Sequence, residues 1–537
     1  KTTSLMKKIS TLAFLVATAF PAIYAAEPVP VPVKLVSAPS REISATNTEI
    51  ISETPEGTLV DPLYSISENS YFIYSSALVS MSTNGYAGAM VRTDDAIYVR
   101  NMISQFDQSS TYWVKGDVES DGSVTFRFPQ LVYHRDASGD VGASDRYVAL
   151  LTPVADGESI RLTTDVGNCD LHMQWDGDRL IQVMPEISDT ALKPFAGIVG
   201  LVDGSGDFLG YGEQGLAYKA SELVLLTPPA DLATNRYVLD YVTGDGSPKS
   251  GVITVGTSGD DVWFKGFNSF ISEAWVKGEL KEGKVSIPST YTGVYEGYVT
   301  YVTGLSPDDK ELVAPVTLTV TEDGYKVDGK MFVSIGDEVV DYNDNRVIAD
   351  AVMTPYAEGE RIPATPVIDT SEEGTEAFNE EEGMGALIFT MEPVDIEGNT
   401  LEQSNLYYNI FRNGELYTFN KDEYFLETDM TYIPYDFQSD LIMSMYGYFF
   451  VFFLEDMDSI GVRAVYQDGD TTTYSEIATY VFHETGVESV GASSEVVSVE
   501  YLDLGGRRVA DPGQGIYIRL THYADGSSKA SKTVVRK

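Results

Sequence analysis

Residues that could do chemistry are scattered in this chain, and none of them forms a recognisable catalytic set. The four histidines, at positions 134, 172, 483 and 522, lack the spacing that a zinc protease requires. A Gly-x-Ser-x-Gly elbow and a complete phosphate-binding loop, in which Gly-x-x-x-x-Gly-Lys is followed by Ser or Thr, are also absent. The 81 acidic residues guarantee carboxylate pairs by chance, so such pairs neither support nor exclude a glycosidase. We therefore expect a protein that is not an enzyme.

Paired aspartates offer the clearest metal-binding pattern. Asp94 and Asp95 precede one expected strand, and Asp260 and Asp261 precede another in a similar context. Turn oxygens of this kind can hold calcium, but the local sequence supplies too few ligands for its usual coordination number. We favour a polar hairpin turn at both places and expect no cofactor, with calcium at these aspartates as the alternative.

Four tryptophans are the candidate binding residues. An exposed indole on a β-surface can stack on the apolar face of a sugar, which makes Trp113, Trp175, Trp263 and Trp275 candidates for glycan contact. Trp113 and Trp275 stand in alternating apolar segments, however, and such rings are usually buried. The alternative is therefore that these rings belong to the core.

An internal repeat positions three of these tryptophans. Residues 93–102 match residues 258–267, and residues 112–118, which include Trp-Val-Lys-Gly, match residues 274–280. An Asp-Gly or Glu-Gly turn follows each copy, which is typical of a β-hairpin. The repeat is too long for a solenoid unit. We predict two homologous antiparallel β-sandwich or barrel modules, at residues 57–227 and 228–364.

The remaining sequence also predicts β-structure. Residues 365–486 contain alternating apolar runs separated by Asn413-Gly414 and Asp468-Gly469 turns, and this segment resembles a fibronectin-type-III-like sandwich. The 34 tyrosines and 23 phenylalanines favour strands and supply large apolar area. Cys169 is the only cysteine, so no intramolecular disulfide forms. The expected fold class is all-β.

The N-terminal segment has the pattern of a secretory signal. Met6-Lys7-Lys8 is followed by the apolar run Ile9 to Phe20 and by the small pair Ala25-Ala26. The apolar run is shorter than the roughly 20 residues that span a bilayer. We expect residues 1–26 to be removed, no transmembrane segment to remain, and residues 27–56 to form a proline-rich and polar linker.

The C-terminal segment, residues 487–537, contains a Gly-Ile-Tyr-Ile strand, an Asp-Gly turn and a lysine-containing end, with Gly515, Tyr517, Asp525, Gly526 and Lys532 as their characteristic residues. This pattern resembles the Por or type IX secretion sorting domain of Bacteroidetes proteins. The resemblance implies a small β-sandwich that the secretion machinery binds. The whole order of segments is similar to that of uncharacterised secreted proteins of Bacteroides and Prevotella, which implies a secreted or outer-surface location.

The strongly negative charge of the chain argues against two classes of binding partner. The formal net charge of −45 disfavours nucleic acid, because a polyanion repels phosphates, and it disfavours an anionic membrane surface. We expect a non-catalytic binding or adhesion protein that contacts a glycan or an extracellular protein. The alternatives are a secreted polysaccharide hydrolase with unidentified carboxylates and a structural surface spacer.

Overall fold

The computed structural model describes residues 49–482, apart from 75–76, 105, 107–110, 138–142, 165–168, 221–222, 337–345, 372–373, 380–382 and 446, together with short strands near both ends. The regular secondary structure of these residues is almost entirely β-strand, which confirms the all-β prediction. The predicted signal segment lies outside the described residues, as does most of the linker. Within the described part, no helix has the length and apolar character needed to cross a membrane.

The chain divides into two compact units. Unit 1 comprises residues 1–364, 393–406 and 466–473, and unit 2 comprises residues 365–392, 407–465 and 474–537. This division differs from the expected boundary, because two segments of the predicted 365–486 module are packed into unit 1. One of them includes the predicted turn at Asp468-Gly469, which joins two strands of a hairpin.

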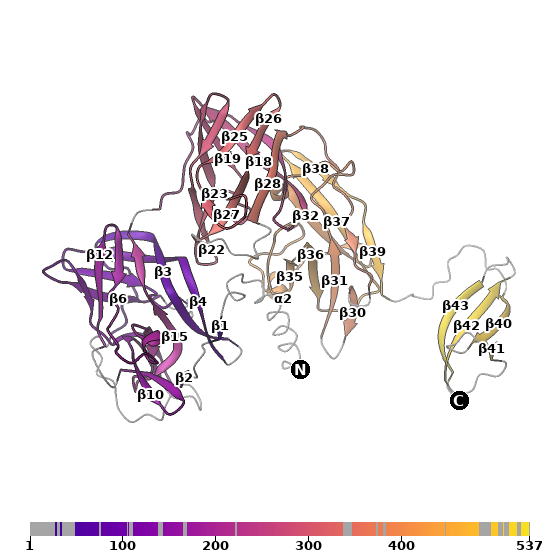
Figure 1. Cartoon of the computed structure of the whole chain (residues 1–537). Coiled ribbons are helices and arrows are strands. Elements are labelled where there is room, and N and C mark those ends of the chain that lie inside the picture. Colours follow the sequence, from indigo (N-terminus) through magenta and orange to yellow (C-terminus); the bar gives the residue numbers. More distant parts are fainter. Residues whose placement is uncertain are drawn as a thin grey trace. The chain divides into compact units, whose positions relative to one another are not determined.

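Unit 1 contains both sequence repeats (Figure 1). The first part has β1 (Glu27–Pro28), β2 (Val33–Lys34), β3 (Thr58–Tyr74), β4 (Ala77–Arg92), β5 (Ala96–Arg100), β6 (Trp113–Val118), β7 (Val124–Phe126), β8 (Gln130–Arg135), β9 (Ser144–Leu150), β10 (Thr152–Asp156), β11 (Ser159–Thr163), β12 (Leu171–Asp176), β13 (Arg179–Gln182), β14 (Val199–Val202), β15 (Phe208–Gln214) and β16 (Ala217–Lys219). The second has β17 (Thr234–Val242), β18 (Pro248–Ser258), β19 (Asp261–Lys265), β20 (Trp275–Lys281), β21 (Lys284–Ile287), β22 (Thr290–Tyr295), β23 (Tyr298–Leu305), β24 (Leu312–Val313), β25 (Val316–Thr321), β26 (Gly324–Asp328), β27 (Lys330–Ile335) and β28 (Val347–Pro355).

Each repeat buries its own apolar core. Val99, Val114 and Phe126 belong to a large cluster in the first repeat. Phe264, Val276 and Ile287 occupy the matching strands of the second repeat and belong to a separate cluster. The alternation of side chains along a strand explains this division, because every second residue of β5, β6, β19 and β20 faces the core. The residues between them, which include Trp113, Trp263 and Trp275, face away from it, whereas Trp175 of β12 packs against the core of the first repeat.

Unit 2 is built largely from two antiparallel sheets. One contains β29 (Val367–Ile368), β30 (Glu376–Asn379), β31 (Met384–Thr390), β35 (Ile442–Met445) and β36 (Tyr448–Phe453). The other contains β32 (Leu406–Arg412), β33 (Glu415–Leu416), β34 (Ile433–Pro434), β37 (Ser459–Asp468), β38 (Thr471–Tyr474) and β39 (Ala478–Val481). Phe389 and Phe449 of the first sheet contact Tyr408 of the second, with ring centroids 5.3 and 5.6 Å from it. These aromatic contacts place the core of unit 2 between the sheets. A short helix, α2 (Lys421–Tyr424), follows β33.

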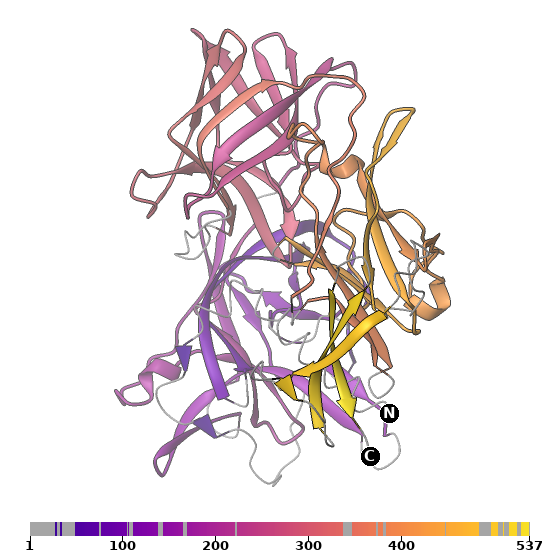
Figure 2. The same ribbon diagram turned by 90° about the vertical axis from the view of Figure 1, so that its right-hand side faces the viewer.

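The C-terminal strands form a separate antiparallel sheet, drawn in yellow in Figure 2. It consists of β40 (Val496–Leu502), β41 (Arg508–Val509), β42 (Gly515–Tyr523) and β43 (Ser528–Val535). Gly515 and Tyr517 of the predicted sorting signal lie on β42, and Lys532 lies on β43 opposite Ile518. Asp525 and Gly526 lie outside the described residues.

Candidate functional site

The two Trp-Val-Lys-Gly hairpins have the same register. In the first repeat Tyr98 pairs with Lys115 and Arg100 with Trp113. In the second repeat Trp263 pairs with Lys277 and Lys265 with Trp275. Each hairpin therefore presents two cross-strand pairs of a cation and an aromatic ring on the face turned away from the core. Three of these pairs place the cation 5.7 to 6.0 Å from the ring centroid, within the range of a cation–π interaction.

Burial changes the interpretation of two predicted binding residues. Trp113 is 1% exposed and packs with Ala89, Val91 and Ile51, the last of which also makes a β-bridge to it. Trp263 is buried as well. An indole covered in this way has no free face on which a sugar can stack. As a correction to the sequence prediction, Trp113 and Trp263 are therefore packing residues in this structure.

The other two tryptophans are only partly buried. Trp275 is bridged by Leu226, which occupies the place that Ile51 has against Trp113. Trp175 lies on β12, and the guanidinium of Arg92 is 4.7 Å from its ring centroid. Each ring thus already has a neighbour on one side. The glycan-contact prediction for these two tryptophans stays a prediction.

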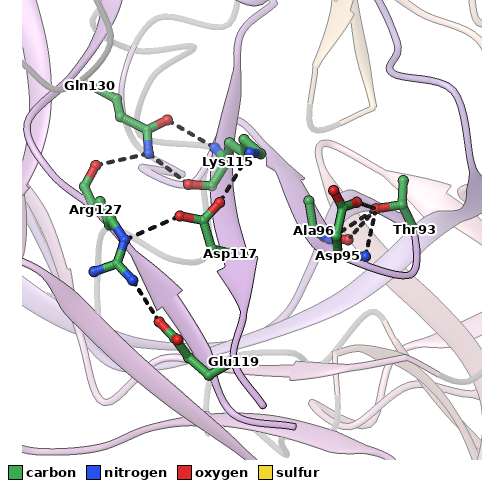
Figure 3. Close-up of polar contacts among 8 residues, drawn as sticks. All are labelled: Thr93, Asp95, Ala96, Lys115, Asp117, Glu119, Arg127 and Gln130. Atoms are coloured by element: carbon green, nitrogen blue, oxygen red, sulfur yellow. Dashed lines mark hydrogen bonds and ion pairs between the residues drawn. The ribbon is translucent and has the colours of Figure 1, made fainter.

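The predicted metal residues belong to turns with backbone functions. The carbonyl of Asp95 accepts a hydrogen bond from the Val118 amide at 2.9 Å, and the carbonyl of Asp260 accepts one from the Leu280 amide at 2.7 Å. Asp95 therefore corresponds to Asp260, so the aspartate pairs are displaced by one residue between the repeats. Thr93 Oγ1 donates to Asp95 Oδ1 at 2.8 Å and closes the turn (Figure 3).

No support for calcium comes from the side chains around these turns. Asp261 forms an ion pair with Lys277 at 3.2 Å, and Asp94 is exposed. Over the residues that the structure describes, no group of three or more histidine, cysteine, aspartate or glutamate side chains is arranged to hold a metal ion. Calcium needs six to eight oxygen ligands, so two aspartates on a turn are not a site by themselves. Their geometry fits the polar hairpin turn that we favoured.

Charged side chains beside the first hairpin neutralise one another. Figure 3 shows Asp117 between Lys115 and Arg127, with Nζ–Oδ1 and Nε–Oδ2 distances of 3.0 and 3.2 Å. Arg127 also pairs with Glu119 at 2.8 Å, while the Gln130 side chain caps the backbone of Lys115. The hydrogen bond to Asp117 raises the pKa of Lys115. Because this cation is already paired, it offers little to an anionic ligand.

A buried carboxyl group lies in the first repeat. Glu213 is 1% exposed, and its Oε1 accepts hydrogen bonds from the amide and hydroxyl of Ser104 at 2.8 and 2.5 Å. Ser70 Oγ is hydrogen-bonded to the other carboxyl oxygen, Oε2. Burial raises the pKa of Glu213, and its effect exceeds that of these hydrogen bonds, which lower the pKa. The cavity that Glu213 lines has a volume of about 20 Å³, roughly enough for one water molecule, so it has no room for a substrate.

An exposed aromatic surface with an arginine at its centre lies in unit 2, and sequence reasoning did not identify it. We call Tyr432, Arg463 and Tyr474 the Tyr-Arg-Tyr platform. The tyrosines are 39% and 41% exposed. The guanidinium of Arg463 lies 4.2 Å from the ring centroid of Tyr474 and 5.0 Å from that of buried Phe411. The arginine is therefore stacked between two rings.

The strand order explains how these residues meet. Tyr432 immediately precedes β34, which pairs with one edge of β32, whereas Tyr474 ends β38 beyond the other central strand, β37. A hydrogen bond with Tyr432 raises the pKa of Tyr474, so the two hydroxyl groups meet across the central strands. Asn409 Oδ1 accepts from Arg463 Nε at 3.1 Å. No carboxylate within the described residues forms an ion pair with Arg463.

The platform had only a weak signal in the sequence. Tyr432, Arg463 and Tyr474 fall on three separate segments, and no motif links them. Alternation on β37 does place Arg463 on the solvent side of a strand whose neighbours Val462 and Ala464 are buried. The sequence pattern therefore indicates a solvent-facing arginine on this strand. Only the fold shows that two tyrosines lie beside it.

Comparisons with protein-family models, with curated proteins and with solved structures give no match to this chain.

Proposed function

We propose that the protein is exported, displayed on the cell surface and binds a glycan without catalysing a reaction. The predicted signal and the resemblance of residues 487–537 to a type IX sorting domain support export by a Bacteroidetes secretion system. The Tyr-Arg-Tyr platform is the observation that supports binding. It is an exposed aromatic surface that contains a cation without a carboxylate partner among the described residues, in a chain with a net charge of −45.

The chemistry of the platform suits a sugar. The C–H face of a pyranose ring buries apolar area against an exposed tyrosine ring, while ring hydroxyl groups need hydrogen-bond partners in the same plane. Arg463 supplies N–H donors beyond its contact with Asn409, and the tyrosine hydroxyls can donate or accept. Because Phe411 and Tyr474 hold the guanidinium from both sides, little side-chain entropy is lost when a ligand binds.

A glycan array with matched tyrosine variants tests this function. We expect the purified chain to retain at least one glycan, and Tyr474→Ala and Tyr432→Ala each to weaken retention about tenfold, the size expected for losing one aromatic contact. Tyr448→Ala is the control, because Tyr448 is 43% exposed in unit 2 but lies on β36 of the other sheet.

Three outcomes would contradict the proposal. If no glycan is retained, the protein is not a glycan-binding protein. If the control variant weakens binding as much as the platform variants do, the site is elsewhere. Release of reducing sugar from a retained glycan would show hydrolysis and would overturn the non-catalytic assignment.

A further inference from the structure

Arg463 of the Tyr-Arg-Tyr platform is a cation that no described carboxylate neutralises. The chain has 81 acidic residues against 36 lysines and arginines, so arginines are expected to pair with carboxylates. Six others in the described part do so: Arg100, Arg127, Arg161, Arg236, Arg361 and Arg412. Arg463 is instead held by two aromatic rings and an amide. Its positive charge therefore remains available to a ligand.

The contacts of Arg463 determine which of its N–H groups a ligand can reach. The ring centroids of Tyr474 and Phe411 lie 4.2 and 5.0 Å from the guanidinium. Nε donates to Asn409 Oδ1 at 3.1 Å, and this is the one hydrogen bond that Arg463 forms with the residues that the structure describes. A guanidinium carries its other N–H donors on the two Nη atoms. These donors are the ones left for a ligand.

The orientation of the guanidinium is fixed from inside unit 2. Asn409 is completely buried, and its Nδ2 donates to the Thr431 carbonyl at 2.8 Å. The amide oxygen of Asn409 is thereby turned toward Arg463 Nε. Thr431 is next to Tyr432 in the chain, so a single amide connects β32, β37 and the segment that carries this tyrosine. Donors that are positioned before a ligand arrives lose little entropy on binding.

The tyrosine hydroxyls add a further donor to the platform. The hydroxyls of Tyr432 and Tyr474 are hydrogen-bonded to each other. One hydroxyl donates in this bond and the other accepts, so the accepting hydroxyl still has a hydrogen for a ligand. The platform thus combines exposed ring area with several N–H and O–H donors and one positive charge. Such a surface favours a ligand that is rich in acceptors and negatively charged.

We propose that the Tyr-Arg-Tyr platform binds a sugar that carries a carboxylate, such as a uronic acid or a sialic acid. The two Nη atoms of Arg463 can donate to both oxygens of a planar carboxylate, and charge-assisted pairs of this kind are stronger than neutral hydrogen bonds. The C–H face of the same sugar can pack on an exposed tyrosine ring. This inference rests on the proposed glycan-binding function and specifies the class of sugar.

The charge of the whole chain works against such a ligand unless a local site binds it. A protein with a net charge of −45 repels polyanions at long range. Retention of an acidic glycan therefore cannot arise from general electrostatic attraction. At about 0.15 M salt the repulsion is largely screened beyond roughly 8 Å, so the contacts of the platform decide the affinity.

Binding of matched acidic and neutral sugars tests the proposal. The ligands are oligosaccharides of uronic and sialic acids, each compared with the amide derivative, which has nearly the same shape without the charge. Calorimetric titration of the purified chain at about 0.15 M salt measures both members of each pair. We expect saturable binding of at least one acid, and binding of its amide at least about tenfold weaker, because the amide lacks the charge-assisted pair.

Variants locate the preference for the acid. Arg463→Gln should reduce binding of the acid about tenfold, to the level of the amide, and Arg463→Lys should restore only part of it, because lysine keeps the charge without the planar fork. Arg412→Gln is the matched control. It changes the net charge equally and lies on the neighbouring strand β32, but Arg412 is already paired with Glu455. Unchanged circular dichroism would show that the variants still fold.

The outcomes separate this inference from the function on which it rests. Retention of neutral glycans without any acidic one, or equal binding of an acid and its amide, would overturn the inference and leave the glycan-binding function intact. A preference for the acid that Arg463→Gln leaves unchanged, or that Arg412→Gln reduces equally, would overturn it in the same way. Failure to bind any glycan would overturn both.

Discussion

At the scale of single residues, Glu213 shows how surroundings change an ordinary carboxyl group. Three hydrogen bonds from serine groups stabilise the ionised form, but enclosure in the protein removes the water that would otherwise solvate the charge. Burial has the larger effect and raises the pKa. The nearby Tyr218 hydroxyl is buried and has no hydrogen-bond partner among the described residues, so it adds no stabilisation for an anion.

The raised pKa of Glu213 predicts how the stability of unit 1 depends on pH. The pKa of Glu213 is higher in the folded than in the unfolded chain. Its protonated form therefore contributes its full stabilisation below about pH 4.5, the ordinary pKa of a glutamate side chain. That contribution is lost as the pH rises toward the folded-state pKa. Urea unfolding followed by tryptophan fluorescence should therefore show stability falling with pH in this window, since all four tryptophans lie in unit 1.

Glu213→Gln supplies the comparison for this experiment. The amide keeps the shape and can donate to Ser70 while accepting from Ser104, but it does not titrate. The unfolding midpoint of this variant should change less with pH above 4.5 than that of the natural chain. Parallel pH profiles for the two proteins would show that Glu213 is not the group responsible.

At the scale of elements, the repeated hairpin explains why glycine ends the Trp-Val-Lys-Gly motif. A Cβ atom on Gly116 would lie 2.7 Å from Val124 Cγ1, and one on Gly278 would lie 2.4 Å from Val285 Cγ1. Both valines belong to the next strand of the hairpin and are completely buried. The glycine thus leaves space for the following strand to pack. The turn in the second copy also needs positive φ at Glu282 and Gly283, as a two-residue hairpin loop requires.

Gly278→Ala should destabilise unit 1 by about 1–3 kcal/mol, because a core that is already filled resists an added methyl group. Gly251→Ala in β18 of the same repeat is the control, since its added methyl would meet no atom within 4 Å. Urea unfolding measured by tryptophan fluorescence compares the two variants. Equal midpoints would contradict the packing role that we assign to Gly278.

At the scale of the whole molecule, Arg236 connects distant parts of the sequence within unit 1. Its guanidinium pairs with Asp468 at 2.9 Å and with Glu402 at 3.1 Å, and it also pairs with Glu358. The same group lies 4.5 Å from the ring centroid of Tyr356. Residues 393–406 and 466–473 are thereby joined to β17. This network is a physical reason why these segments belong to unit 1.

Arg236→Met should weaken the packing of these segments against β17. The substitution leaves the carboxylates of Asp468, Glu402 and Glu358 without their shared cation, which we expect to lower the free energy of unfolding of unit 1 by about 1–3 kcal/mol. Amide hydrogen exchange should increase in residues 393–406 and 466–473. Arg179→Met is the control, because Arg179 is exposed at the start of β13. Unchanged exchange in both segments would show that apolar packing alone holds them.

The sequence by itself determined the fold class and the repeat, because both depend on local patterns. Alternating apolar residues predict strands, and Glu282-Gly283 or Asn413-Gly414 predict reversals through their backbone freedom. The matching registers of the two hairpins follow from matching residues at equal spacing. The all-β prediction succeeded for this reason.

Only the tertiary structure decided which aromatic residues are available to a ligand. Trp113 is 1% exposed because Ile51, Ala89 and Val91 pack against it, whereas Tyr474 is 41% exposed. Contacts between residues far apart in sequence determine burial, so no local pattern predicts it. The meeting of Tyr432, Arg463 and Tyr474 depends on strand order in the same way.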